Sequence, residues 1–157
     1  MKYKPNVSIY SRAEASKLIE KGAFKNCAVL SFYSPRKKKA PEEVRLDYGD
    51  TAARVFYIGV LDIDRECLVD YSLTFDTYLT EAFDAARFIY SAVEDGLDIV
   101  CQCDYGQSRS AACAAAILQH FEARGIDIFA DYRYYPNQMV YHKIHDALTA
   151  VSAERAR

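Results

Sequence analysis

Residues 97–116 read LDIVCQCDYGQSRSAACAAA, and this stretch decides the fold. Its beginning, 97–101, is a short apolar run of the kind that forms a buried strand. Its alanine-rich end predicts a helix over residues 108–124. Between the two lies a polar loop that carries a thiol at Cys103 and a guanidinium at Arg109. Ligands of α/β proteins bind where a strand ends and a helix begins, so this loop is the first candidate for a functional site.

Strand-like and helix-like segments alternate along the rest of the chain. Further strands are predicted over residues 7–10, 27–33 and 55–61, and further helices over 12–21, over 76–95 and from Pro136 onwards. Residues 35–51 form the longest loop. This alternation predicts an α/β fold with a central, mostly parallel sheet of four or five strands and helices on both faces.

Size and composition are those of an ordinary globular protein. The chain has 157 residues, 51% hydrophobic and 27% charged, and we expect residues 1–157 to form a single domain. The net charge of −2 predicts no nucleic-acid partner. We expect neither a signal peptide nor a membrane partner, because no apolar segment has the necessary length.

The cysteines predict reduced thiols rather than a disulfide or a zinc site. Their number is odd, and without a secretion signal this indicates a cytoplasmic protein. No C-x-x-C pair is present and the three histidines lack finger-like spacing, so we expect no metal. The five cysteines are Cys27, Cys67, Cys101, Cys103 and Cys113.

The polar loop has the features of an anion site. Backbone N–H groups at a helix start, together with the helix dipole, attract a phosphate-like dianion. Gly106 allows backbone angles that a side chain forbids. Arg109 can bind two phosphate oxygens with its planar fork. The same field stabilises negative charge on the sulfur of Cys103, which is then placed to attack a bound phosphoryl group.

The pattern Cys-x5-Arg-Ser between a strand and a helix resembles the signature of the cysteine-dependent protein tyrosine phosphatase superfamily. The best fit is to its small dual-specificity-type members and to short bacterial tyrosine phosphatases. The segments that resemble those short members, in chain order, are VSIYSRAEASKLI, CAVLSFYSP, VLDID, SRSAACAAAIL and YYPNQMVYHKIHDAL.

The resemblance implies a role for each site residue. Cys103 is the nucleophile and forms a phosphocysteine, and Ser110 assists the departure of the thiolate when this intermediate is hydrolysed. The general acid is an aspartate at an earlier strand end, with Asp62 as the first choice and Asp64 as the reserve. No cofactor is implied. The loop residues that bind the phosphate are Asp104, Tyr105, Gly106, Gln107, Ser108 and Arg109.

One residue departs from the family pattern. The family usually has histidine directly before the nucleophile, where this chain has Gln102. Glutamine can also donate a hydrogen bond, but it carries no charge. The loop contains Asp104 and no lysine, whereas members that prefer phosphoinositides often carry lysines there. We therefore expect a phosphoprotein substrate, phosphotyrosine first and phosphoserine or phosphothreonine as the alternative, or a small phosphomonoester. We also expect the protein to be a monomer.

Other interpretations of the same residues remain open. A phosphate-binding module without turnover is one, supported by Gln102, and an arsenate-reductase-like thiol enzyme is another. A serine hydrolase is disfavoured because its G-x-S-x-G turn would need a glycine at Ser110. Sulfurtransferases of the rhodanese type generally lack the Cys-x5-Arg spacing. Cys101 lies on the same strand face as Cys103, and core packing is its expected role, with a disulfide to the nucleophile as the alternative.

Overall fold

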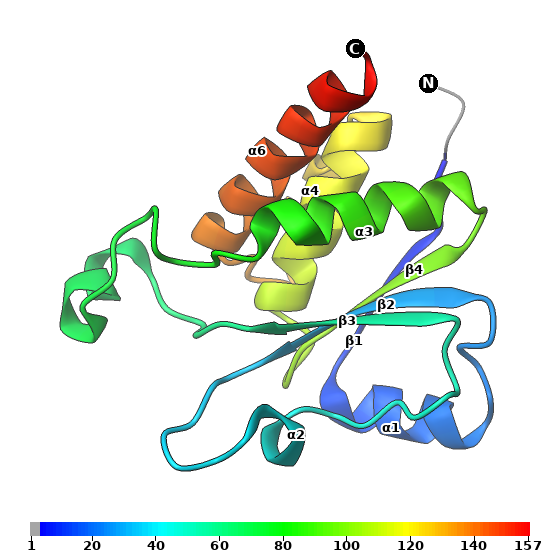
Figure 1. Cartoon of the computed structure of the whole chain (residues 1–157), viewed down its shortest axis with the longest axis horizontal. Helices are drawn as coiled ribbons and strands as arrows, with labels where there is room; N and C mark the ends of the chain where they lie inside the picture. The colour runs from blue at the N-terminus through cyan, green and yellow to red at the C-terminus, as the bar shows by residue number, and fades with distance from the viewer. Residues whose placement is uncertain (1–3) are drawn as a thin grey trace.

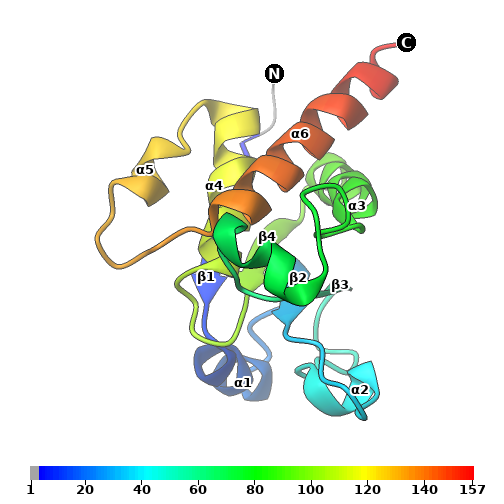
Figure 2. The ribbon, with the colours of Figure 1, turned by 90° about the vertical axis from the view of Figure 1, so that its left-hand side faces the viewer.

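The computed structural model describes residues 4–157, and four parallel strands form its centre (Figure 1). The strands are β1 (Val7–Tyr10), β2 (Cys27–Tyr33), β3 (Arg54–Gly59) and β4 (Asp98–Gln102). Their order across the sheet is β1-β4-β2-β3. All neighbours pair in parallel, so the carboxyl ends of the strands lie along one edge, which Figure 2 faces. The predicted α/β fold is confirmed.

Helices cover both faces of the sheet (Figures 1 and 2). On one face lie α3 (Ala82–Glu94), α4 (Arg109–Glu122) and α6 (Gln138–Arg155), and on the other lie α1 (Arg12–Glu20) and the short α2 (Pro41–Val44). A short helix, α5 (Ile126–Phe129), joins α4 to α6. The 3-10 helix η1 (Arg65–Tyr71) follows β3.

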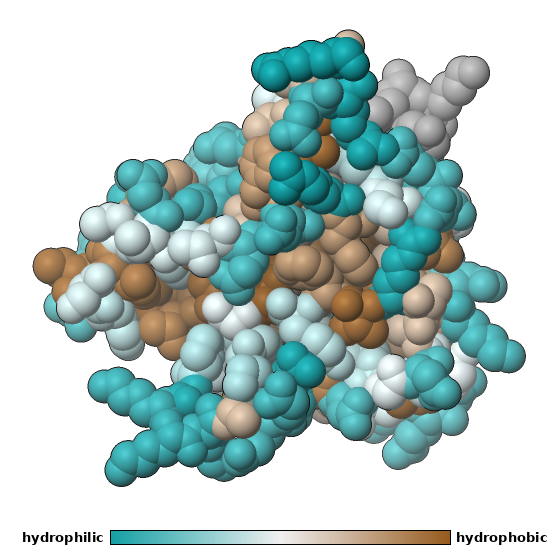
Figure 3. Space-filling view, in the orientation of Figure 1, coloured by the Kyte–Doolittle hydropathy of each residue, from teal (hydrophilic) through white to brown (hydrophobic). Residues whose placement is uncertain are grey.

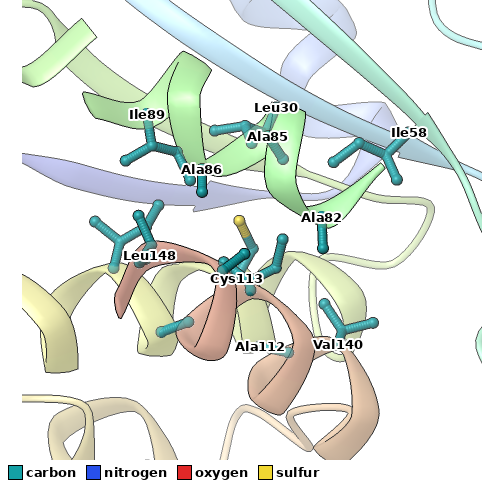
Figure 4. Packing of buried hydrophobic residues seen from close by; sticks show 14 of the residues in the cluster. Leu30, Ile58, Ala82, Ala85, Ala86, Ile89, Ala112, Cys113, Val140 and Leu148 are labelled. Carbon is teal, nitrogen blue, oxygen red and sulfur yellow. The ribbon is translucent and has the colours of Figure 1, made fainter. Parts of the chain in front are cut away.

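The larger core lies between the sheet and the helices α3, α4 and α6 (Figure 4). The side of α4 that faces this core is built mainly from alanine and Cys113, so its backbone can approach the sheet and α6 closely. Leu30 and Ile58 project from the sheet toward Ala82 and Ala85 of α3. This packing holds α4 against the sheet, so that its start at Arg109 lies one short loop after the end of β4 at Gln102.

A smaller core lies on the opposite face, under α1. It contains Phe24, Val29, Tyr48 and Val100. The helix α1 begins with a capping box, in which the Ser11 hydroxyl accepts a hydrogen bond from the backbone N–H of Glu14 and the Glu14 carboxylate accepts one from Ser11.

Several element bounds differ from the sequence prediction. The helix predicted over 76–95 begins only at Ala82, because Leu79 has a left-handed backbone with φ 54° and breaks the first turns. The last helix begins at Gln138, capped by Asn137 rather than started by Pro136. The helices α2, η1 and α5 were not predicted, since each is too short to show a period. Among residues 4–157, no helix is both long and apolar enough to cross a membrane.

Candidate active site

Cys103 directly follows β4, at the carboxyl edge of the sheet. Its side chain is only 3% exposed, and its Sγ lies 3.0 Å from the Oγ of Ser110 in the first turn of α4. A serine hydroxyl at this distance can donate a hydrogen bond to a thiolate. The structure therefore brings together the thiol and the hydroxyl that the sequence paired.

The Cys103 loop, residues 103–109, is held through its carbonyl oxygens and leaves most of its N–H groups unpaired. The carbonyls of Asp104, Gln107 and Ser108 accept hydrogen bonds from the backbone N–H groups of Arg12, Tyr135 and Asn137, at 3.1, 2.8 and 3.2 Å. The backbone N–H groups of residues 104–108, in contrast, have no acceptor within the described part of the chain. A ring of free N–H groups at a helix start is a receptor for an anion.

Gly106 is required in this loop for two reasons. Its φ of +70° lies in the left-handed region, which side chains disfavour. A Cβ atom there would also lie 2.7 Å from the backbone N of Ser11 and 2.9 Å from the carbonyl carbon of Tyr10. The loop can therefore lie against the end of β1 only because residue 106 has no side chain.

Ser34, Val60 and Asp104 hold the guanidinium of Arg109, while its Nε stays free within residues 4–157. It is 4% exposed, and its Nη1 donates to the carbonyl of Val60 at 2.8 Å and to the hydroxyl of Ser34 at 3.0 Å. Its Nη2 pairs with the carboxylate of Asp104 at 3.2 Å. The buried Nε has no partner within residues 4–157. A buried cation with a free donor is costly unless a ligand supplies the acceptor.

The two aspartates that the sequence proposed as acids have different surroundings. The Oδ1 of Asp62 accepts hydrogen bonds from the Ser108 hydroxyl at 2.7 Å and from the Asn137 side-chain amide at 2.9 Å. Asp62 therefore lies against the Cys103 loop, and its Oδ2 has no partner in the described residues. Asp64 precedes η1, is exposed and makes no such contact. Of the two aspartates, only Asp62 has a side-chain hydrogen bond to the Cys103 loop within residues 4–157.

Gln102 lies on the opposite face of the sheet from Cys103. Its Oε1 accepts hydrogen bonds from the hydroxyls of Ser31 at 2.6 Å and Tyr48 at 2.8 Å. All three side chains are buried. Burial raises the pKa of Tyr48, so its hydroxyl remains a donor at neutral pH. Gln102 thus anchors the end of β4 through a neutral network under the loop.

Three of the four remaining cysteines are buried. Cys101 is fully buried. Its pKa is raised, mainly by a hydrogen bond with Cys113 and also by burial. Both thiols belong to the core around α4. This placement agrees with the packing role expected for Cys101. Cys27 is also buried, and burial raises its pKa, whereas Cys67 lies in η1.

Several residues that hold the site were not found from the sequence. Ser34 contacts Arg109, and Asn137 contacts both Asp62 and the carbonyl of Ile63. The buried Tyr78 donates to the carbonyl of Leu61 at 2.6 Å. Only Asn137 had a detectable signal, since asparagine after proline is a favoured helix cap. The contacts of the others join positions far apart in the chain.

Comparison with solved structures places this fold among phosphatases. Human DUSP28 superposes with a TM-score of 0.53 at 18% identity, covering 96% of both chains. Human tyrosine phosphatase-like serine/threonine/tyrosine-interacting protein gives a TM-score of 0.53 at 16% identity, covering 94% of this chain and 87% of that one. PTPMT1, in complex with PI(5)P, gives 0.54 at 12% identity, covering 99% of both chains.

These similarities show the fold. The chain has the α/β fold of the tyrosine and dual-specificity phosphatases, which confirms at the level of fold the resemblance seen in the sequence. No protein-family model matches the sequence, and no curated protein matches it.

Proposed function

We propose that this protein is a cysteine-dependent phosphatase that hydrolyses phosphomonoesters through a phosphocysteine. The observation that carries the proposal is the receptor around Cys103: a buried thiol, unpaired N–H groups at residues 104–108 and the unpaired Nε of Arg109 converge on one loop. A phosphoryl group provides oxygen acceptors for these donors, and its phosphorus then lies above the sulfur.

In the first step the Cys103 thiolate attacks phosphorus and the bond from phosphorus to the leaving oxygen breaks. Asp62 gives its proton to that oxygen from Oδ2, while its Oδ1 stays on Ser108 and Asn137. The Nε and Nη2 of Arg109 form one edge of the guanidinium and bind two of the phosphoryl oxygens. Binding at Nη2 requires the Asp104 carboxylate to move aside.

In the second step water attacks the phosphocysteine. Asp62, now ionised, takes the proton of the water, and the sulfur–phosphorus bond breaks to release phosphate. The thiolate that leaves accepts a hydrogen bond from Ser110, whose Oγ lies 3.0 Å from the sulfur. This completes the cycle with no metal and no cofactor.

We further propose phosphotyrosine of proteins as the preferred substrate. Asp104 contributes negative charge to the loop and no lysine is present there, which disfavours the highly anionic phosphoinositides. Tyr105 in the loop is 82% exposed and offers an aromatic wall at the entrance. The proposal treats residues 1–157 as one catalytic domain, active as a monomer in the reducing cytoplasm.

The test is hydrolysis of a generic aryl phosphate by the purified protein. We expect turnover that survives a chelator and is abolished in the Cys103→Ser variant. Phosphotyrosine, phosphoserine and phosphoinositide substrates then rank the classes. An activity that a chelator removes and that Cys103→Ser leaves intact would overturn the proposal. Phosphopeptide binding without any turnover would instead indicate a phosphate-binding module, the alternative raised by Gln102.

A further inference from the structure

A basic cleft opens beside the Cys103 loop. It has a volume of about 260 Å³ and lies between the start of α1, the turn after β2 and α2. Figure 3 shows hydrophilic residues gathered over α2 and the loop that precedes it. Among its lining residues are three basic side chains, Arg12, Arg36 and Lys39, and two acidic ones, Glu43 and Asp104.

The basic cleft shares a wall with the candidate active site. Ser34 and Asp104 line it, and these same two residues contact the guanidinium of Arg109 at 3.0 and 3.2 Å. A phosphoryl group bound to Arg109 would therefore lie next to the cleft. Since an extended peptide advances about 3.3–3.6 Å per residue, we expect a side chain one or two positions away to enter the cleft.

A backbone carbonyl fixes the guanidinium of Arg12, and a turn fixes the backbone of Arg36 and Lys39. The N–H of Arg12 donates to the carbonyl of Asp104 at 3.1 Å, and its Nη1 donates to the carbonyl of Val44 at 2.6 Å. Arg36 and Lys39 are the two ends of one tight turn, closed by a bond of 3.4 Å from the N–H of Lys39 to the carbonyl of Arg36.

These three cations have no intramolecular counter-ion. Within residues 4–157, none of Arg12, Arg36 and Lys39 forms an ion pair. Asp104 is already paired with Arg109, which leaves Glu43 as the one unpaired acid in the cleft wall. The surplus of positive charge suits one added anionic group, whereas Glu43 and Asp104 oppose a polyanion.

We propose that the basic cleft binds a second anionic group of the substrate, a carboxylate or a phosphate, one or two residues from the phosphotyrosine that occupies the Cys103 loop. This inference rests on the proposed function and refines its substrate class to phosphopeptides with an acidic neighbour. Arg36 and Lys39 are then specificity-determining residues, and Arg12 supports them from α1.

The experiment compares phosphotyrosine peptides that differ at one neighbouring position, with glutamine, glutamate or phosphoserine there, before or after the phosphotyrosine. We expect kcat/KM to be about five- to tenfold higher for an acidic peptide than for the glutamine peptide. In Arg36→Ala/Lys39→Ala this ratio should fall below about twofold. The glutamate and phosphoserine arms show whether carboxylate or phosphate is preferred.

The matched control is Lys37→Ala/Lys38→Ala. It removes the same charge from the same turn, but neither residue lines the cleft. The control should keep the preference for acidic peptides. The proposal would be overturned if the wild-type protein had nearly equal kcat/KM for the acidic and glutamine peptides. It would also be overturned if both double variants lost the preference equally, because a long-range electrostatic field alone would explain that result. The proposal would also be overturned if Arg36→Ala/Lys39→Ala lowered kcat/KM for a soluble inositol polyphosphate more than for the acidic peptide.

Binding separates this proposal from the proposed function. Titration of Cys103→Ser with the glutamate and glutamine peptides measures the preference without turnover. Tighter binding of the glutamate peptide that depends on Arg36 and Lys39 supports the cleft even if the wild-type protein hydrolyses nothing. Equal binding of both peptides by Cys103→Ser overturns the cleft even if hydrolysis is found.

Discussion

The Cys103 loop and the segment that carries Asp62 meet at one edge of the sheet but are held in opposite ways. The loop is pinned by backbone hydrogen bonds from α1 and from residues 135–137, and its Cys103 and Arg109 are 3% and 4% exposed. Asp62 is exposed and is held by two side-chain hydrogen bonds. It leads into η1, where Val69 is 77% exposed.

This difference fits the two tasks that we propose. Donors that stabilise charge in a transition state act best when they are fixed before the substrate arrives. A general acid, in contrast, has to meet leaving groups of different shape, so an exposed segment suits it. The loop should therefore tolerate no change in its backbone, whereas the acid segment should tolerate every change except loss of the carboxyl group.

After loss of the Cys103 thiol itself, replacing the arginine of the loop should have the largest effect on kcat. Arg109→Lys keeps the charge but loses the fork and the bond to Val60, so we expect kcat for an aryl phosphate to fall about 10²- to 10³-fold. The exposed Arg133→Lys, in a pair with Asp131, is the control and should change kcat less than about twofold. If kcat of Arg109→Lys for the aryl phosphate stayed within about threefold of the wild-type value, the proposed role of Arg109 in phosphate binding would be contradicted.

The next largest effect should be a difference in kcat between the variants Asp62→Asn and Asp64→Asn. Asp62→Asn keeps the contact with Ser108 but has no proton to give, and we expect kcat to fall about 10²-fold for a poor leaving group and less for an activated aryl phosphate. The kcat of Asp64→Asn should stay within about threefold of the wild-type value. Steady-state rates for two aryl phosphates with different leaving groups measure both. If Asp64→Asn showed the larger loss, the acid would be Asp64.

The backbone of the loop offers a third test. Gly106→Ala places a methyl group against Ser11 and Tyr10, so we expect at least about a tenfold loss of kcat and a loss of about 1–3 kcal/mol in the free energy of unfolding. Gly96→Ala is the matched control: its φ is also positive, at +73°, but no atom lies within 4 Å of the added carbon. Equal effects would mean that only the backbone angle matters.

The network under the loop should affect stability more than activity. Gln102→Leu leaves the buried hydroxyls of Ser31 and Tyr48 without their acceptor, and we expect the free energy of unfolding to fall by about 1–3 kcal/mol. Denaturant unfolding measures it. Tyr48→Phe removes one donor and should cost less. A loss of activity in Gln102→Leu as large as in Arg109→Lys would show that residue 102 acts on the thiol itself.

The sequence was sufficient where the pattern was local. The strand 97–101, the helix 108–124 and the thiol between them were predicted to within two residues, because the apolar run, the glycine and the alanine-rich segment are contiguous. The parallel sheet followed from alternation alone. The helix predicted over 12–21 was equally local, and the structure places its start at Arg12.

Contacts between distant segments could not be predicted from the sequence. Ser34 reaches Arg109 from 75 positions away and Tyr48 reaches Gln102 from 54, and no spacing rule predicts such pairs. The contacts of Asp62, the first choice for the general acid, with Ser108 and Asn137 likewise join distant positions. The left-handed Leu79 shortened α3 against its apolar period, since a single backbone angle outweighed the pattern.

The most direct test of the central claim is to trap the covalent intermediate. In Ser110→Ala the thiolate loses the hydroxyl 3.0 Å from its sulfur, so hydrolysis of the phosphocysteine should become slower than its formation. Rapid mixing with an aryl phosphate and intact-protein mass spectrometry should then show a gain of one phosphoryl group per chain, located on Cys103 by peptide mapping. A phosphoryl group on any other residue, or release of phosphate by the wild-type protein with no phosphorylated enzyme in either form, would contradict the account.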